Sequence, residues 1–301
     1  MIVGRFAPSP SGRMHLGNVF SALIAWLSVR SQGGKMLLRI EDLDPDRSKQ
    51  VYIDALRRDL VWLGLDWDEE MPPQSTRDAV YSSFFEKLPV YPCFCSRNEL
   101  HSASAPHGTD GVLLYAGTCR NLTPEQRQSK TRRPAWRVQV PHETITFTDK
   151  LYGTVTQSLS RSCGDFILRR SDGVYAYQLA VVCDDALGGV TQVVRGRDLL
   201  DSTPRQIWLY RTLGFSVPEF AHVPLLVAPD GRRLSKREAD LDMGALQTAY
   251  TAPELIGILA HSAGLLPSVE PCCPQDLIPL FSWDKITNRD ISILDYLHRD
   301  V

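Results

Sequence analysis

Two segments that lie far apart in the sequence carry residues suited to binding a polyphosphate. The first, residues 8–18, contains His15, which can donate a hydrogen bond to a phosphate oxygen, and Gly17, which leaves room for a nucleotide. The second, residues 232–237, reads RRLSKR, and its Lys236 is the kind of cation that phosphoryl or adenylyl transfer needs near the leaving group. Each segment also has a simpler interpretation, the first as an ordinary turn and the second as a solvated basic loop.

A further group with chemical potential is formed by Cys93, Cys95 and Cys119. An odd number of cysteines in a chain of cytosolic character favours metal binding or free buried thiols over disulfides, and zinc is the metal that such a group would hold. Successive side chains of a strand point to opposite faces, so the Cys-Phe-Cys spacing needs a turn to bring both thiols together. The other cysteines are expected to be free thiols, with the first two in the core: Cys163, Cys183, Cys272 and Cys273.

The first polyphosphate segment lies between a predicted strand and a predicted helix. Residues 2–7 form a short apolar strand, prolines interrupt regular structure over 8–12, and apolar residues recur at helical spacing from 17 to 30. A second strand, residues 35–40, leads directly into Glu41. Such a strand–helix–strand unit is typical of a doubly wound parallel sheet, where ligands bind at the carboxyl ends of the strands. The loop and Glu41 are therefore expected to share one crevice.

Downstream, residues 91–141 differ in character and indicate an insertion rich in Cys, His, Gly, Ser and Arg. Asp172-Gly173 is a typical hairpin turn and predicts flanking strands at 165–170 and 174–182. The remaining predictions are helices at 48–63, 81–88 and 199–213, strands at 137–140, 144–148, 153–158 and 192–195, and a mostly helical tail after residue 236.

The composition is that of an ordinary globular protein. With 301 residues, 43% hydrophobic and 23% charged, the chain is not disordered, fibrous or a disulfide scaffold. The net charge of −2 excludes a generally basic nucleic-acid coat, so contact with a nucleic acid must rest on a local patch. A secretion signal and an apolar run of membrane-spanning length are missing, so we expect a cytoplasmic protein without membrane association. One basic cluster is a candidate for phosphate contact, with a solvated surface as the simpler interpretation: Arg127, Lys130, Arg132 and Arg133.

The two polyphosphate segments together resemble the HIGH and KMSKS signatures of class I aminoacyl-tRNA synthetases. Other stretches are similar to the glutamyl-tRNA synthetase group: RFAPSP at 5–10, RIEDLD at 39–44, AYQLAVV at 176–182, DD at 184–185 and VRGRDLL at 194–200. The resemblance covers residues 1–245. Two positions depart from the signatures, Asn18 at the fourth HIGH position and Arg233 at the first KMSKS position, but Arg233 keeps the charge and activity is still expected.

The resemblance implies a ligase that uses ATP, accompanied by Mg²⁺, to convert L-glutamate to glutamyl-adenylate. His15 and Lys236 would be catalytic and stabilise the charge that develops on the phosphate oxygens. The ATP-binding positions would be His15, Gly17, Asn18, Asp198 and Lys236. The glutamate-binding positions would be Arg5, Phe6, Ala7, Pro8, Ser9, Glu41, Tyr177 and Arg195. The arginines suit the side-chain carboxylate and Glu41 suits the α-ammonium group, although a structural ion pair is the alternative for each residue taken singly.

In this family the insertion carries a zinc site in which a tyrosine follows two cysteines and precedes a third. The resemblance therefore implies one structural Zn²⁺ held by Cys93, Cys95, Tyr115 and Cys119. A phenol oxygen is an unusual ligand for zinc, so His101 or His107 is the alternative to the tyrosine.

The length of the chain distinguishes between branches of the group. The resemblance implies a Rossmann-type catalytic domain of residues 1–90 and 142–236, an inserted zinc-binding α/β subdomain of residues 91–141, and a short helical region of residues 237–301. That last region is too short for an anticodon-binding domain. The branch with this build activates glutamate without tRNA and transfers it to the queuosine base in the anticodon of tRNA(Asp), and we expect a monomer. The alternatives are a truncated enzyme that charges the 3′ end of tRNA(Glu) and a non-catalytic glutamate- or nucleotide-binding module.

Overall fold

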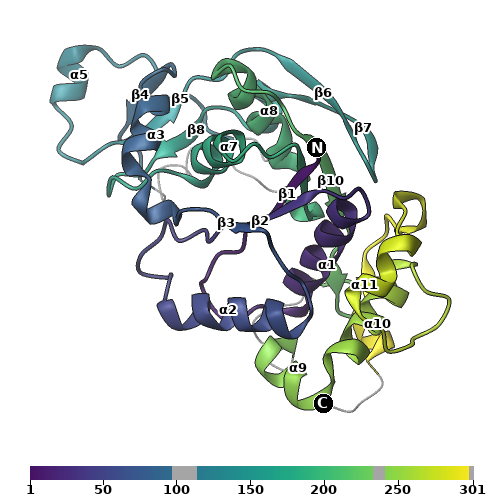
Figure 1. Cartoon of the computed structure of the whole chain (residues 1–301). Coiled ribbons are helices and arrows are strands. Elements are labelled where there is room, and N and C mark those ends of the chain that lie inside the picture. The colour runs from purple at the N-terminus through teal and green to yellow at the C-terminus, as the bar shows by residue number, and fades with distance from the viewer. Residues whose placement is uncertain (97–113, 233–240, 298–301) are drawn as a thin grey trace.

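The computed structural model describes residues 1–96, 114–232 and 241–297, and its elements surround a largely parallel sheet (Figure 1). The strands are β1 (Val3–Phe6), β2 (Lys35–Leu38), β3 (Glu69–Glu70), β4 (Val90–Cys93), β5 (Ala135–Val138), β6 (Thr144–Asp149), β7 (Gly153–Ser158), β8 (Phe166–Arg169), β9 (Gln192–Gly196), β10 (Glu219–Val223), β11 (Leu226–Val227) and β12 (Ile291–Ser292). The helices are α1 (Leu16–Arg30), α2 (Gln50–Trp62), α3 (Asp78–Phe85), α5 (Pro124–Gln128), α6 (Leu159–Ser162), α7 (Tyr177–Leu187), α8 (Thr203–Thr212), α9 (Met243–Ala249), α10 (Ala252–Ala263) and α11 (Pro274–Leu277).

Two sets of parallel strands meet at the boundary between β1 and β9. On one side β1 pairs with β2 and β2 with β3, and on the other β9 pairs with β10 and β10 with β6, all in parallel. β7 closes the far edge as an antiparallel partner of β6. The Thr191 N–H donates to the Val3 carbonyl at 2.9 Å and thereby links the two sets. The strand order runs outward from this boundary in both directions, so the boundary is the topological switch point where such sheets bind ligands.

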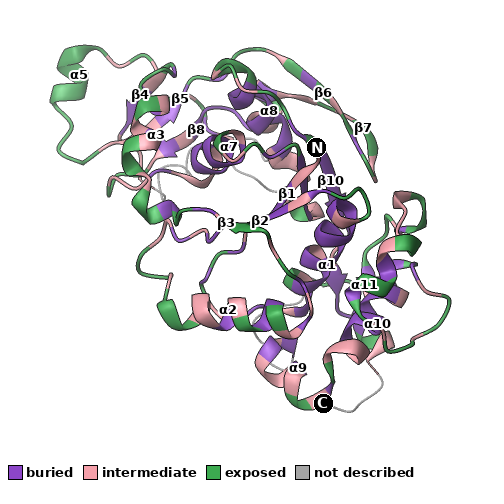
Figure 2. Ribbon diagram, viewed as in Figure 1, coloured by how far each residue is buried: buried purple, intermediate pink, exposed green. Residues whose placement is uncertain are grey.

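Two hydrophobic cores cover the two faces of this sheet. Met36 and Leu38 of β2 face the first core, with α1 and α10, whereas Leu37 between them faces the second, with α3, α7 and α8. This alternation follows from the two-residue period of a strand. Figure 2 shows α1 and α10 buried over most of their length, whereas α2 is exposed along its outer side. Helices on both faces of a parallel sheet confirm the predicted Rossmann-type architecture.

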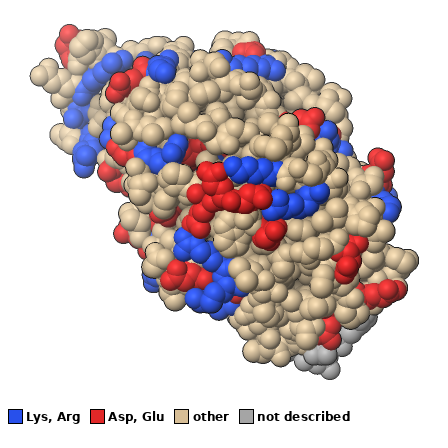
Figure 3. Space-filling view, viewed as in Figure 1, with Lys and Arg blue, Asp and Glu red and all other residues tan. Residues whose placement is uncertain are grey.

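The segment that follows α3 builds a separate antiparallel sheet in the order β4-β5-β8. Tyr91, Cys93, Tyr115 and Cys119 form a small core of their own beside it. Helix α5 projects at this end of the molecule, where basic side chains gather on the surface (Figures 1 and 3). The basic cluster around Arg127 is exposed there.

The hairpin predicted around Asp172-Gly173 is only half correct. Its first strand forms as β8, but the partner is reduced to one bridge between Arg169 and Tyr175, and Tyr177 already begins helix α7. The predicted strand 174–182 is wrong because a short, largely apolar run fits a buried helix as well as a buried strand. The packing of α7 against α3 and α8 decides between them.

The predicted helix 199–213 begins as a 3-10 helix, Arg197–Ser202, before α8. The predicted helical tail contains α9, α10 and α11. Near its end the short strand β12 pairs in parallel with β11. Among the helices in the described ranges, none has the length and apolar character needed to cross a membrane.

Candidate active site

A pocket of about 550 Å³ opens at the β1–β9 switch point. Its walls are β1 and the following loop, the start of α1, the segment after β2, the first turn of α7 and the end of β9. All sequence-predicted glutamate and ATP positions that the structure describes line it: Arg5, Phe6, Ala7, Pro8, Ser9, His15, Gly17, Asn18, Glu41, Tyr177, Arg195 and Asp198. Lys236 and Arg233 lie outside the described residues, although Leu241, which follows them, also lines the pocket.

The first turn of α1 forms the phosphate-attracting part of the pocket. His15 is the residue that precedes the helix, and its backbone N–H donates to the Asn18 side-chain oxygen at 3.1 Å. Asn18, the residue that departs from the signature, therefore makes the return hydrogen bond of a capping box at this end of the helix. A side chain added at Gly17 would meet no atom within 4 Å, so the backbone there is open to a ligand. Free N–H groups and the helix dipole at such an end favour a phosphate.

Glu41 provides a buried negative charge at one side of the pocket. Its side chain is 8% exposed and accepts a hydrogen bond from Arg39 Nη2 at 3.1 Å. Burial raises the pKa of the Glu41 carboxyl even though Arg39 and Arg5 oppose that change. A further cation in the pocket, such as an ammonium group, would favour the charged form of Glu41.

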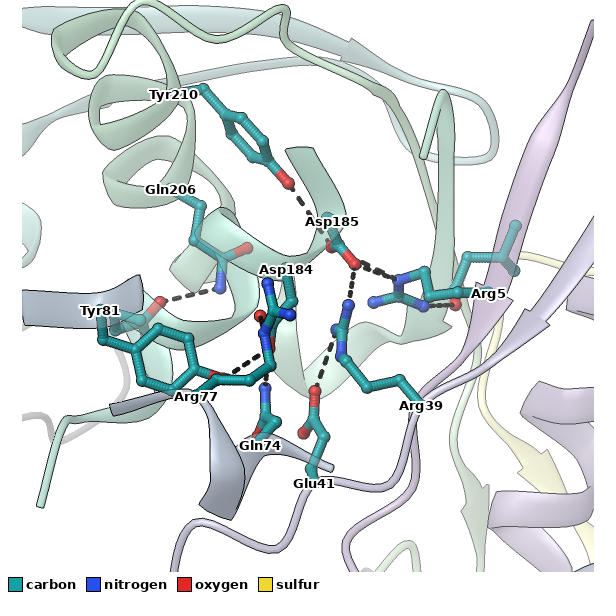
Figure 4. A network of polar contacts seen from close by, with 12 residues as sticks. Arg5, Arg39, Glu41, Gln74, Arg77, Tyr81, Asp184, Asp185, Gln206 and Tyr210 are labelled. Atoms are coloured by element: carbon teal, nitrogen blue, oxygen red, sulfur yellow. Dashed lines mark hydrogen bonds and ion pairs between the residues drawn. The ribbon is translucent and has the colours of Figure 1, made fainter. Parts of the chain in front are cut away.

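Behind Glu41, a cluster of buried ions joins β1, β2 and α7 (Figure 4). Asp185 forms a short ion pair with Arg39 Nη1 and a second pair with Arg5 Nε at 3.4 Å. Burial raises the pKa of Asp185, but these two guanidinium groups outweigh burial and hold that pKa below its ordinary value. Arg5 Nη1 donates to the Val194 carbonyl of β9 at 3.1 Å. The cluster therefore ties together both sides of the switch point.

Arg195 at the end of β9 is buried, with 5% of its surface exposed, yet it has no carboxylate partner among the ion pairs of the described residues. Its Nε donates to His222 Nε2 at 3.1 Å, and its Nη2 donates to Thr203 Oγ1 at 2.8 Å. Its Nη1 is buried without a hydrogen-bond partner within the part of the chain that the structure describes. An unpaired donor of this kind costs free energy unless a ligand accepts from it. Burial lowers the pKa of Arg195, but an arginine stays protonated at neutral pH.

Sequence reasoning missed four residues that support this site. Asp185 was noted only as part of a family stretch, and Asp149, Thr203 and His222 were not singled out at all. The one available signal was polar residues inside apolar segments, such as the histidine in the strand EFAHV. Their partners lie far away in the sequence, so spacing alone could not reveal them.

The thiols of Cys93, Cys95 and Cys119 lie within 4.8 Å of one another, a spacing compatible with a metal ion. The thiols of Cys95 and Cys119 are 3.6 Å apart, and the Tyr115 hydroxyl lies 3.5 Å from Cys93 Sγ and 4.0 Å from Cys95 Sγ. A tetrahedron with zinc–sulfur bonds of about 2.3 Å has edges of about 3.8 Å, so these donors fit zinc. Strand β4 ends at Cys93, so Cys95 lies beyond the extended segment, as the Cys-Phe-Cys spacing required. The alternative ligands His101 and His107 lie outside the described residues.

Arg137 of β5 supplies a positive charge next to these thiols. Its guanidinium lies 3.9 Å from the centre of the Tyr115 ring, and its Nε donates to Cys93 Sγ at 3.3 Å. Burial raises the pKa of Cys93, but its hydrogen bonds with Tyr115, the Cys95 backbone and Arg137 together outweigh burial and hold that pKa below its ordinary value. The predicted core thiols Cys163 and Cys183 are indeed buried and free.

Comparison with known proteins agrees with this geometry. The family model of the catalytic domain of class I tRNA synthetases (E and Q) matches residues 1–253. The glutamyl-Q tRNA(Asp) synthetase of Symbiobacterium thermophilum is 47% identical over 97% of this chain and 96% of its own length. That of Nitratidesulfovibrio vulgaris is also 47% identical, over 99% of both chains.

A solved structure of a longer enzyme shares the fold. The glutamate-tRNA synthetase from Elizabethkingia anophelis matches with a TM-score of 0.82 at 26% identity, and the match covers 96% of this chain and 67% of that one. Sequence, fold and pocket lead to the same assignment. The chain belongs to the class I tRNA synthetases (E and Q), and within them to the group of the glutamyl-Q tRNA(Asp) synthetases.

Proposed function

We propose that this protein activates L-glutamate with ATP in the switch-point pocket and transfers the glutamyl group to the queuosine base of tRNA(Asp). One observation supports the activation step. The same pocket is lined by Arg195, whose Nη1 has no hydrogen-bond partner among the described residues, and by Glu41, whose carboxylate is buried. An amino acid with an acidic side chain complements both groups. The names of the two near full-length relatives support the second substrate.

In this proposal the arginines select the substrate. Arg195 Nη1 and the guanidinium of Arg5 bind the side-chain carboxylate, and Glu41 binds the α-ammonium group. Tyr177 lines the same pocket, and burial raises its pKa, so its hydroxyl stays protonated and can donate a hydrogen bond. Glutamine would leave the guanidinium groups without an anionic partner, and unpaired buried donors cost about 1–3 kcal/mol each.

The chemistry requires no covalent nucleophile on the protein. An oxygen of the glutamate α-carboxylate attacks the α-phosphorus of ATP, and the bond to the bridging oxygen breaks to release pyrophosphate. His15 and the first turn of α1 stabilise the charge on the phosphates, together with Lys236 and the Mg²⁺ that accompanies ATP. Gly17, Asn18 and Asp198 form the surrounding nucleotide site.

We further propose that Cys93, Cys95, Tyr115 and Cys119 hold one structural zinc ion, with no position left for a substrate. The metal would stabilise residues 91–141 as an inserted subdomain between the catalytic segments 1–90 and 142–236. The exposed basic residues near α5 would contact tRNA phosphates. Treatment of the purified protein with a chelator should release close to one zinc ion per chain and lower the melting temperature. Protein that folds without stoichiometric zinc would contradict the assignment.

Two assays test the proposed function. Glutamate-dependent exchange of pyrophosphate into ATP should proceed without tRNA, which a non-catalytic binding module could not support. Labelled glutamate should then appear on queuosine-containing tRNA(Asp) but not on the same tRNA without queuosine. Label on the 3′ end of tRNA(Glu) instead would favour the alternative of a truncated charging enzyme, for which the fold shared with the longer glutamate-tRNA synthetase is the supporting observation.

A further inference from the structure

His222 of β10 lies behind the pocket rather than in its wall. The side chain is fully buried and pairs in register with Arg195, because β9 and β10 run in parallel with these two residues opposite each other. Its Nδ1 lies 2.7 Å from Asp149 Oδ2 at the end of β6. A row of three polar side chains therefore crosses three neighbouring strands inside an otherwise apolar sheet.

The partners of His222 define the protonation of its ring. The Asp149 carboxylate can only accept, so Nδ1 carries the proton and donates it. The Arg195 guanidinium can only donate, so Nε2 accepts from Arg195 Nε at 3.1 Å. Burial lowers the pKa of His222 to about 4, which is consistent with a neutral ring at physiological pH.

We propose that His222, oriented by Asp149, is a positioning residue that fixes the Arg195 guanidinium so that Nη1 faces the substrate carboxylate. Thr203 Oγ1 completes the arrangement, because it accepts from Arg195 Nη2 at 2.8 Å and lies 3.1 Å from His222 Nε2. Nε and Nη2 are thereby occupied by the protein, and Nη1 is left for the ligand. The inference rests on the proposed binding of glutamate by Arg195.

A neutral imidazole suits this task better than a carboxylate would. A carboxylate next to Arg195 would neutralise the guanidinium and compete with the substrate for it. His222 instead holds the guanidinium through one directional bond and leaves its positive charge available. Asp149 stays one step removed, and its other oxygen accepts from the backbone N–H groups of Leu151 and Tyr152 at 3.0 Å each.

Two substitutions of similar size separate positioning from mere packing. In His222→Gln the side-chain amide oxygen reaches the place of Nε2 and can accept from Arg195. In His222→Asn the amide can still donate to Asp149, but no atom reaches Arg195. His142→Asn, at an exposed histidine, is the matched control. The measurements are the KM values for glutamate and for ATP in pyrophosphate exchange, together with the melting temperature.

We expect His222→Asn to raise the KM for glutamate about tenfold, as for the loss of one charged hydrogen bond, with the KM for ATP unchanged. His222→Gln should stay within about threefold of the unmodified protein, and so should His142→Asn. If His222→Asn does not fold, Thr203→Val provides the same test, because it removes the second bond to Arg195. Folded variants in which glutamate and ATP KM values change equally, or not at all, would overturn the inference. An unmodified protein without exchange activity would instead refute the proposed function.

Discussion

Two buried arginine clusters flank the pocket and are held in opposite ways. Arg39 is paired with both Asp185 and Glu41, and Arg5 is paired with Asp185, so each guanidinium of that cluster has a carboxylate partner. Arg195 is held by the neutral groups of His222 and Thr203, and one of its nitrogens has no partner among the described residues. The first arrangement resembles a structural ion pair, whereas the second resembles a receptor for an anion.

This difference shows why a list of charged residues is not enough to locate a binding group. A buried ion pair is costly to break, because removal of one partner leaves the other charge uncompensated. A guanidinium that is to bind a ligand must instead be fixed in place without being neutralised. We therefore expect substitutions in the Asp185 cluster to affect stability first and substitutions around Arg195 to affect glutamate binding first.

The largest effect is expected for Asp185→Asn, which keeps the shape of the side chain but removes its charge. Arg5 would then be buried without a paired carboxylate and Arg39 would keep only Glu41, so the free energy of unfolding should fall by about 3–5 kcal/mol. Denaturant titration measures this loss. Glu219→Gln, in an exposed pair with Lys150 at 3.1 Å, is the control and should change stability by less than about 1 kcal/mol. Equal effects of the two variants would contradict the comparison.

Acidification should also distinguish the two clusters, because their titrating groups lose their contributions to stability at different pH values. His222 has a pKa of about 4 in the folded protein against 6.5 ordinarily, so the unfolded chain binds its proton first. Stability should therefore fall as the pH drops from 6.5 to about 4, by at most about 3 kcal/mol from this group. Asp185 has a lowered pKa, so its contribution is present above pH 3.8 and is lost only below that value.

Denaturant titrations of the unmodified protein and of His222→Gln across this pH range provide the measurement. The variant should lose less stability between pH 6.5 and 4, because the glutamine cannot be protonated. Identical profiles for the two proteins would mean that His222 is not the group that titrates.

Arg195→Ala tests the receptor side directly. We expect the KM for glutamate in pyrophosphate exchange to rise about a hundredfold, because a charged hydrogen-bond donor to the substrate is lost. The KM for ATP should change by less than about threefold, since the nucleotide positions are on other residues. Arg195→Lys should fall in between, because an ammonium group keeps the charge but lacks the planar fork. A KM for glutamate that is unchanged in Arg195→Ala would remove this residue from the site.

The smallest effect is expected for Tyr210→Phe. The Tyr210 hydroxyl donates to Asp185 Oδ2 at 3.4 Å, a long bond to a carboxylate that already has two guanidinium partners. Stability should fall by about 1 kcal/mol or less, and the KM for glutamate should not change. A rise in that KM would show that the Asp185 cluster also tunes substrate binding, which would weaken the contrast between the two clusters.

The loop at 8–18 and Glu41 could be placed in one crevice because both follow strand ends, whereas Arg5, Tyr177 and Arg195 were predicted from the family resemblance. Arg5, Glu41 and Arg195 each occur at or just beyond a strand of the parallel sheet, and such ends converge at one edge. The prediction of secondary structure failed where the local sequence pattern was ambiguous. The apolar run after Asp172-Gly173 fits a strand or a helix, and only its neighbours α3 and α8 decide the outcome.

The sequence by itself determined the βαβ start, which depends on contacts between near neighbours in the chain. It identified the pocket residues through their resemblance to a family. Only the tertiary structure decided which arginines have carboxylate partners and which one keeps a nitrogen without a partner among the described residues. Asp185 reaches Arg39, and Asp149 reaches His222, across long stretches of sequence. Those pairings exist because the sheet places distant strands side by side, and no local pattern encodes that adjacency.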